Sequence, residues 1–133
     1  MNLFKKLLIA FIVISIIGIS ACSSPSTTPT TQTSGGNSVN INLSATALAF
    51  DKSTITVPHG ATVTINFTNH DGVEHNFVLY TNSTASTAIF VGQLITGPNK
   101  SITYTFTAPS SPGTYFFRCG VHPTSMTGTF IVT

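Results

Sequence analysis

The feature that most constrains the fold is a regular alternation of apolar and polar residues after residue 38. Every second residue is apolar in TVTINF (62–67) and in SITYTF (101–106). A period of two is typical of β-strands that bury one face and expose the other. No segment past residue 38 shows the apolar period of an amphipathic helix. The alternation therefore predicts an all-β domain.

Turn-forming residues divide this region into short strands. They occur as PHG (58–60), DG (71–72), GPN (97–99), PSSPG (109–113) and GVHP (120–123). Denser apolar runs at 75–80, 114–119 and 127–132 are typical of central strands. We predict an antiparallel Greek-key β-sandwich of seven or eight strands that forms one domain, residues 39–133. Residues 81–92 fit a strand, a loop or a short helix, and their structure is left open.

The first 22 residues have the layout of a secretory signal. Two lysines precede an apolar run, and small residues precede Cys22. The last four residues, ISAC, resemble the bacterial lipoprotein box, in which the cysteine becomes a lipidated first residue. A plain signal peptide and an uncleaved anchor helix are the alternatives, since a membrane span needs about 20 apolar residues. We expect an extracytoplasmic protein, lipid-anchored to a prokaryotic membrane in the periplasm or at the cell surface.

Residues 23–38 (SSPSTTPTTQTSGGNS) contain no large apolar side chain. This composition predicts a flexible tether. The chain after the signal carries three cations and three anions, a net charge of zero: Lys52, Lys100 and Arg118 against Asp51, Asp71 and Glu74. A neutral domain without a basic patch is not expected to bind nucleic acid.

The segment CGVHPTSM, which begins at Cys119, brings a thiol, an imidazole and a thioether together. Gly120 and Pro123 disfavour a helix, so we expect a loop between two strands. Such a loop can direct Cys119, His122 and Met126 to one ion. Thiolate, imidazole and a weak thioether suit copper that cycles between Cu(I) and Cu(II), provided that a second histidine completes the set.

Two other roles for Cys119 have to be weighed. A disulfide with Cys22, the only other cysteine, is disfavoured because a lipidated cysteine has no free thiol and the bond would tie a tether to a strand end. An unpaired thiol outside the cytoplasm is oxidised unless it is buried or bound. The remaining choice is an inert buried cysteine or a metal thiolate, and the nearby His122 and Met126 favour the thiolate.

His75 is the candidate for the missing ligand. It opens an apolar strand, in phase with Phe77 and Leu79. A lone histidine in that position is usually a satisfied core residue, but the loop at Cys119 still needs a partner. His59 and His70 lie in turn sequences and are predicted to face water. We therefore expect His75 to be the second histidine ligand.

The segments NHDGVEHNFVLY and GTYFFRCGVHPTSMTGTFIV resemble those of the cupredoxin family, small blue copper proteins such as plastocyanin, amicyanin and pseudoazurin. The resemblance covers residues 39–133. It implies one type 1 copper ion with His75, Cys119 and His122 in a trigonal plane and Met126 as axial ligand. It also implies that Asn76 braces the loop that carries the cysteine. Three residues separate His122 from Met126, a spacing between the commoner ones of the family, so how firmly Met126 binds is left open.

The resemblance implies electron transfer rather than catalysis. Electrons would leave through the exposed edge of His122, within an apolar patch formed by Val121 and Pro123. We expect a monomer, not an enzyme, that exchanges single electrons with a redox protein such as a cytochrome or an oxidase. With no net charge, docking should be brief and only weakly dependent on salt.

Two other functions use the same sequence features. A membrane-tethered lipoprotein that binds or delivers copper could share the ligands, although such carriers tend to use several exposed methionines and histidines. A metal-free adhesive sandwich on a stalk would not account for the loop at Cys119. Electron transfer is the preferred interpretation.

Overall fold

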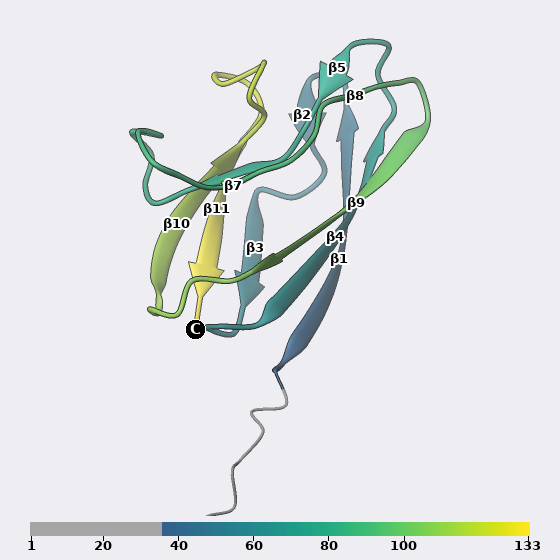
Figure 1. The fold of residues 1–133 in the computed structure, drawn as a ribbon. Helices are drawn as coiled ribbons and strands as arrows, with labels where there is room; N and C mark the ends of the chain where they lie inside the picture. Colours follow the sequence, from purple (N-terminus) through teal and green to yellow (C-terminus); the bar gives the residue numbers. More distant parts are fainter. Residues whose placement is uncertain (1–35) are drawn as a thin grey trace, which may run out of the picture. The chain divides into compact units, whose positions relative to one another are not determined.

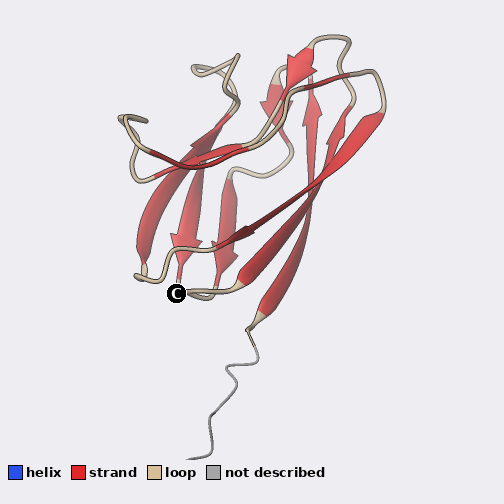
Figure 2. Cartoon of the chain, viewed as in Figure 1, coloured by secondary structure: helices blue, strands red, loops and turns tan. Residues whose placement is uncertain are grey.

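The computed structural model describes residues 36–133, which form β-strands joined by loops and contain no helix (Figures 1 and 2). The predicted signal with Cys22 and nearly all of the predicted tether lie outside these residues. The first strand begins at Ser38, one residue before the predicted start of the domain. No helix that could span a membrane occurs between residues 36 and 133.

Two main sheets and one short ribbon make up the described fold. The first sheet has the order β2 (Ala49–Phe50), β1 (Ser38–Thr46), β4 (Thr62–Asn69) and β9 (Lys100–Thr107). The second has the order β3 (Thr54–Val57), β11 (Thr127–Val132), β10 (Gly113–Arg118), β6 (Val78–Tyr80) and β7 (Ala88–Val91). The ribbon pairs β5 (Glu74–His75) with β8 (Ile95–Thr96).

The all-β sandwich predicted from the alternation is confirmed. Among residues 36–133 there are eleven strands, three of which have only two residues, which leaves eight longer ones. Residues 81–92, left open above, form turns and then β7. The alternation is visible in β4, where Val63, Ile65 and Phe67 are buried and their neighbours are more exposed.

The strand directions differ from the predicted antiparallel arrangement. β1 pairs with β4 in parallel, and β11 pairs with β3 in parallel, whereas the other pairings are antiparallel. Between β1 and β4 the chain crosses to the second sheet as β3 and then returns, which allows β1 and β4 to run in the same direction. A period of two is the same in both kinds of ladder, so the pattern does not distinguish them.

Aromatic rings fill the space between the sheets. Phe77 lies at their centre, with its ring centroid 5.3 Å from that of Phe117 and 6.0 Å from that of Phe106. Phe67 stacks on Tyr104 at 5.9 Å. Each fully buried phenylalanine contributes about 1.5–3 kcal/mol, so this cluster is a large part of what holds the two sheets together.

The β1–β2 hairpin turns on two residues with left-handed backbone. Ala47 has φ 51° and Leu48 has φ 59°, and they follow directly on the last pair of the ladder, Thr46 with Ala49. Two-residue turns of this kind favour Asn-Gly, and the left-handed conformation costs other residues roughly 1–2 kcal/mol each. Asp71 holds the turn, because its carboxylate accepts both turn N–H groups, at 2.8 and 3.0 Å.

The run at 75–80, predicted to be one strand, is divided between two sheets. Glu74 and His75 belong to the ribbon with β8, and the strand resumes only at Val78 in the second sheet. Side chains from His75 to Leu79 are all buried, because the chain passes between the sheets here and neither of its faces is open to water. This passage delivers His75 to the end of the sandwich where the loop at Cys119 lies.

Candidate metal centre

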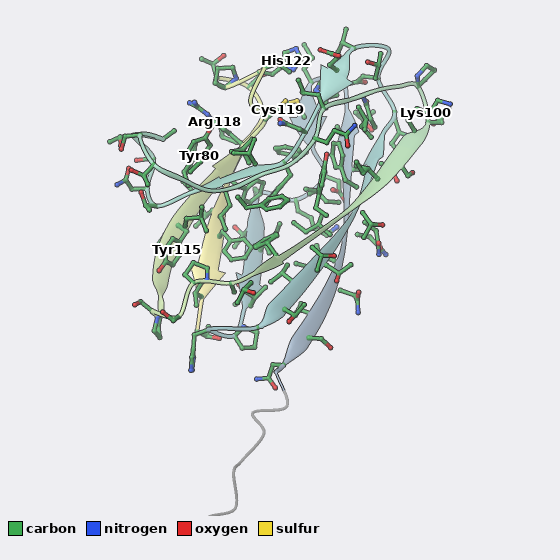
Figure 3. The ribbon with its side chains drawn as sticks, in the orientation of Figure 1. Tyr80, Lys100, Tyr115, Arg118, Cys119 and His122 are labelled. Atoms are coloured by element: carbon green, nitrogen blue, oxygen red, sulfur yellow. The ribbon has the colours of Figure 1, made fainter. Side chains whose placement is uncertain are left out.

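Three of the predicted ligands meet at one end of the sandwich. Cys119 Sγ lies 3.7 Å from His75 Nδ1 and 3.7 Å from His122 Nδ1. One ligand atom from each residue lies within 4.8 Å of the others. His75 comes from β5, and the other two come from the loop between β10 and β11. Figure 3 shows Cys119 and His122 at the end of the domain opposite the C-terminus.

The spacing fits a shared metal ion. With zinc sites as a guide, sulfur binds at about 2.3 Å and nitrogen at about 2.0 Å, so two such ligands about 120° apart are separated by about 3.7 Å. Cys119 is a free thiol and is fully buried, which suits a thiolate held by a metal. One sulfur and two imidazole nitrogens form a donor set that suits copper.

The loop that carries Cys119 and His122 is closed by backbone hydrogen bonds. The N–H of Cys119 donates to the carbonyl of Met126 at 2.9 Å, and the N–H of Met126 donates to the carbonyl of His122 at 3.1 Å. The second bond makes a single turn, which ends where β11 begins at Thr127. The Met126 side chain is fully buried. The loop thus directs Met126 inward, from the same segment as the other two donors.

Asn76 connects the two sides of the centre. Its Oδ1 accepts the N–H of Gly120 at 2.8 Å, and its Nδ2 donates to the carbonyl of Gly92 at 2.8 Å. Asn76 follows His75 directly, whereas Gly120 follows Cys119. One buried amide therefore ties the strand that supplies His75 to the loop that supplies Cys119, and it gives the buried carbonyl of Gly92 a hydrogen-bond partner.

Asp71 is a contact of the centre that sequence reasoning did not assign. Its Oδ2 lies 2.9 Å from His75 Nε2, on the side of the ring away from Cys119. The backbone N–H groups of Leu48 and Ala47, together with His75, hold the pKa of Asp71 below its ordinary value. The carboxylate is therefore ionised at neutral pH, and it can only accept a hydrogen bond from the N–H at His75 Nε2. The sequence feature that could have identified Asp71 is its position four residues before His75, since ligand histidines commonly contact a carboxylate.

A second polar group near the centre is held neutral. The hydroxyl of Tyr104 donates to the carbonyl of Gln93 at 2.7 Å. Burial, and to a lesser extent Cys119, raise the pKa of Tyr104 above its ordinary value. The phenol therefore stays protonated and acts as a structural donor.

The outer side of the centre is an open, mainly apolar surface. His122 is half-buried, while Val121 and Pro123 beside it are exposed. Val73 adds a third exposed apolar side chain. A shallow depression is lined by Gly72, Val73, Glu74, Thr96, Val121 and His122. Exposed apolar side chains thus lie beside the half-buried His122 ring, together with the polar Glu74 and Thr96.

The other histidines lie away from the three donors. His59 is exposed, with its Nδ1 3.0 Å from the carbonyl of Thr133, and His70 is exposed beside Asn99 at 2.8 Å. Both positions agree with the turn locations expected for them. Asp51 accepts the N–H of Ser44 at 2.7 Å, in the β1–β2 hairpin.

Comparisons with known proteins agree with this geometry. The cupredoxin-like domain family matches residues 9–132. Auracyanin-A of Chloroflexus aurantiacus is 34% identical over 124 residues, which covers 74% of this chain and 76% of that protein. The solved structure of auracyanin A, described as a "blue" copper protein, is 30% identical with a TM-score of 0.63, and covers 73% of this chain and 100% of its own.

Two further solved structures are similar. The auracyanin of Roseiflexus castenholzii is 31% identical with a TM-score of 0.64, over 74% of this chain and 99% of its own. Amicyanin of Paracoccus versutus, at 22% identity and a TM-score of 0.51 over 71% and 81% of the two chains, supports the fold. The chain therefore belongs to the cupredoxin-like domain family.

Proposed function

We propose that this protein is a mononuclear type 1 copper protein that carries single electrons and is not an enzyme. The observation that carries the proposal is a buried Cys119 sulfur 3.7 Å from a ring nitrogen of both His75 and His122. The likeness to auracyanin A, a "blue" copper protein, supports it. His75, Cys119 and His122 would hold the ion, with the Met126 sulfur as the fourth, weaker donor.

The chain's own residues keep the donors in fixed positions. Copper, when bound, supplies a one-electron Cu(I)/Cu(II) couple. Asn76 fixes the loop at Gly120, and the backbone bond from Cys119 to Met126 closes the base of that loop. Asp71 contacts the far side of His75. With the ligands braced in this way, a change of oxidation state requires little movement of the protein, which favours rapid electron exchange.

The surface around His122 is the proposed docking site for a redox protein, such as a cytochrome or an oxidase. Of the three proposed histidine and cysteine ligands, His122 alone is partly exposed. Val121, Pro123 and Val73 supply apolar contact area around it. Apolar contact without a charged patch favours short-lived complexes, which suit a monomeric carrier that must release its partner after each transfer.

Delivery of copper is less well supported by the same site. A delivery protein has to pass its ion to an acceptor, and this requires ligands that the acceptor can reach. Here His75, Cys119 and Met126 are each fully buried. Exchange would require the loop to open, so electron transfer is the function that the burial favours.

The location of the protein is proposed from its first residues. The secretory layout of residues 1–22 supports an extracytoplasmic domain, and the ISAC sequence supports a lipid on Cys22. Residues 23–38 would then be the tether between a prokaryotic membrane and the domain at 39–133. Mass spectrometry of the protein from membranes tests this: a diacylglyceryl-modified Cys22 as first residue is expected, and an unmodified or uncleaved N-terminus contradicts it.

Spectroscopy of the copper-loaded full chain tests the function. An intense blue absorption and a narrow copper hyperfine splitting are expected with Cu(II), and both should disappear in Cys119→Ser because the thiolate–copper bond is their source. Reversible one-electron voltammetry should follow. A pale protein with a wide splitting, or transfer of the ion to a chelator faster than electron exchange, would contradict electron transfer.

A further inference from the structure

We propose that Asp71 is a positioning residue that sets the tautomer of His75 and ties this ligand to the β1–β2 turn. The inference rests on the proposed function, since it concerns the same copper centre. It adds to that function a residue that is no ligand itself but adjusts the relative affinity of the centre for Cu(II) and Cu(I). Three contacts of one carboxylate carry it.

The carboxylate of Asp71 joins two segments that are distant in sequence. Oδ1 accepts the N–H of Ala47 at 2.8 Å, and Oδ2 accepts the N–H of Leu48 at 3.0 Å. Oδ2 also lies 2.9 Å from His75 Nε2. Both amides belong to the strained left-handed turn. The group that holds this turn therefore also contacts the ligand.

The backbone of Asp71 is itself fixed by a buried amide. Asn69 is fully buried, and its Oδ1 accepts the N–H of Asp71 at 2.8 Å. Its Nδ2 donates to the carbonyls of Val73 at 2.7 Å and Ile95 at 2.9 Å. Asn69 thereby holds both the loop before β5 and the strand that pairs with β5. With the Asp71 backbone held in place, the carboxylate could follow a displaced His75 ring only by giving up its bonds to the Ala47 and Leu48 amides.

This arrangement selects one tautomer of His75. A carboxylate can only accept, so the ring proton lies on Nε2, and Nδ1 presents its lone pair toward Cys119. An anionic acceptor also makes the imidazole a stronger donor. A stronger donor stabilises Cu(II) more than Cu(I), so Asp71 is expected to lower the reduction potential of the centre.

The variant that tests this is Asp71→Asn in the full chain, with Asp51→Asn as its matched control. Asp51 also accepts a backbone N–H of the β1–β2 hairpin, that of Ser44 at 2.7 Å, but it has no contact with His75. Loss of a partner of a ligand histidine typically weakens metal binding about 10–100-fold. We expect Asp71→Asn to weaken Cu(II) binding about tenfold more than Cu(I) binding, which raises the potential by about 59 mV, and Asp51→Asn to leave it unchanged.

A second measurement uses the copper-free wild-type chain, so it does not depend on how the variant folds. Nitrogen-15 NMR should show His75 with its proton on Nε2, and hydrogen exchange should show slow amides at Ala47 and Leu48. In Asp71→Asn, the amide that replaces the carboxylate can donate to Nε2, so the proton should move toward Nδ1 and both turn amides should exchange faster.

The results separate this inference from the proposed function. A wild-type chain that never turns blue overturns the copper function, while the tautomer and exchange data still decide the role of Asp71. A blue wild-type chain whose His75 carries its proton on Nδ1 overturns the inference alone. So does an Asp71→Asn chain with the potential of the Asp51→Asn control.

Discussion

The two histidines of the centre differ in how firmly their rings are held, although the ring centroids are only 4.8 Å apart. His75 is fully buried on β5, and its outer nitrogen contacts Asp71. His122 is half-buried in a loop, and among residues 36–133 its ring contacts only the sulfur of Cys119 at hydrogen-bonding distance. The centre thus has a fixed side at His75 and an accessible side at His122, where we propose that a redox partner docks. This division makes specific predictions.

The largest effect is expected from removing each imidazole in turn. Copper-loaded His75→Gly and His122→Gly should both lose the blue absorption, because each lacks one strong ligand. Added imidazole should restore most of the absorption in His122→Gly, since that position opens to solvent, and little of it in His75→Gly, since that position is sealed. Visible absorption during an imidazole titration measures this. Equal recovery in both variants would remove the distinction between the two sides.

Asn76 connects the strand of His75 to the loop of His122, so the second-largest effect is expected from its loss, as a decrease in stability. Asn76→Ala leaves the N–H of Gly120 and the carbonyl of Gly92 without their partners. The carbonyl of Gly92 is buried, and an unsatisfied buried group costs about 1–3 kcal/mol, so we expect the free energy of unfolding of the copper-free chain to fall by about 2 kcal/mol. Urea denaturation provides the measurement.

Asn66→Ala is the control for that experiment. Asn66 donates to Asn42 at 3.2 Å on the exposed face of the first sheet. Its removal should change the free energy of unfolding by less than about 0.5 kcal/mol. If the two alanine variants were equally stable, Asn76 would not be the connection between the fixed side and the loop.

The smallest effect is expected on the free energy of unfolding, from a change in the β1–β2 turn that contacts Asp71. Leu48→Gly relieves a left-handed leucine that is 42% exposed, so it should raise the free energy of unfolding by about 1 kcal/mol. Leu94→Gly, at another exposed leucine without positive φ, should lower it. Thermal unfolding of both variants distinguishes strain relief from a general effect of glycine. A destabilised Leu48→Gly would mean that the turn is not strained.

Period-two alternation and turn residues were sufficient to predict the sandwich and most of its strands. They could not predict strand direction, because parallel and antiparallel ladders share the same period. They also predicted a single strand over 75–80, although the chain passes from the β5–β8 ribbon to the second sheet at Asn76 and Phe77. A run that is apolar throughout does not show where its hydrogen-bonding partner changes.

The donors at the centre were predictable because their chemistry is unusual and three of them are close in sequence. Asp71 was predicted only as a turn residue, since its partners are 4, 23 and 24 residues away. The sequence contains no sign that Ala47 and Leu48 would be left-handed, because neither residue type favours that conformation. Contacts of this kind depend on how the fold brings the β1–β2 turn to the loop and strand from Asp71 to His75.

The burial of Cys119 has a practical consequence. It is the only cysteine after residue 22, and its side chain has no exposed surface. A thiol reagent can therefore reach it only when the segment from Cys119 to Met126 separates from the rest of the domain. In the copper-free protein, the rate of Cys119 alkylation therefore measures how often this segment opens. With the metal bound, the alkylation rate would report the residence time of the ion.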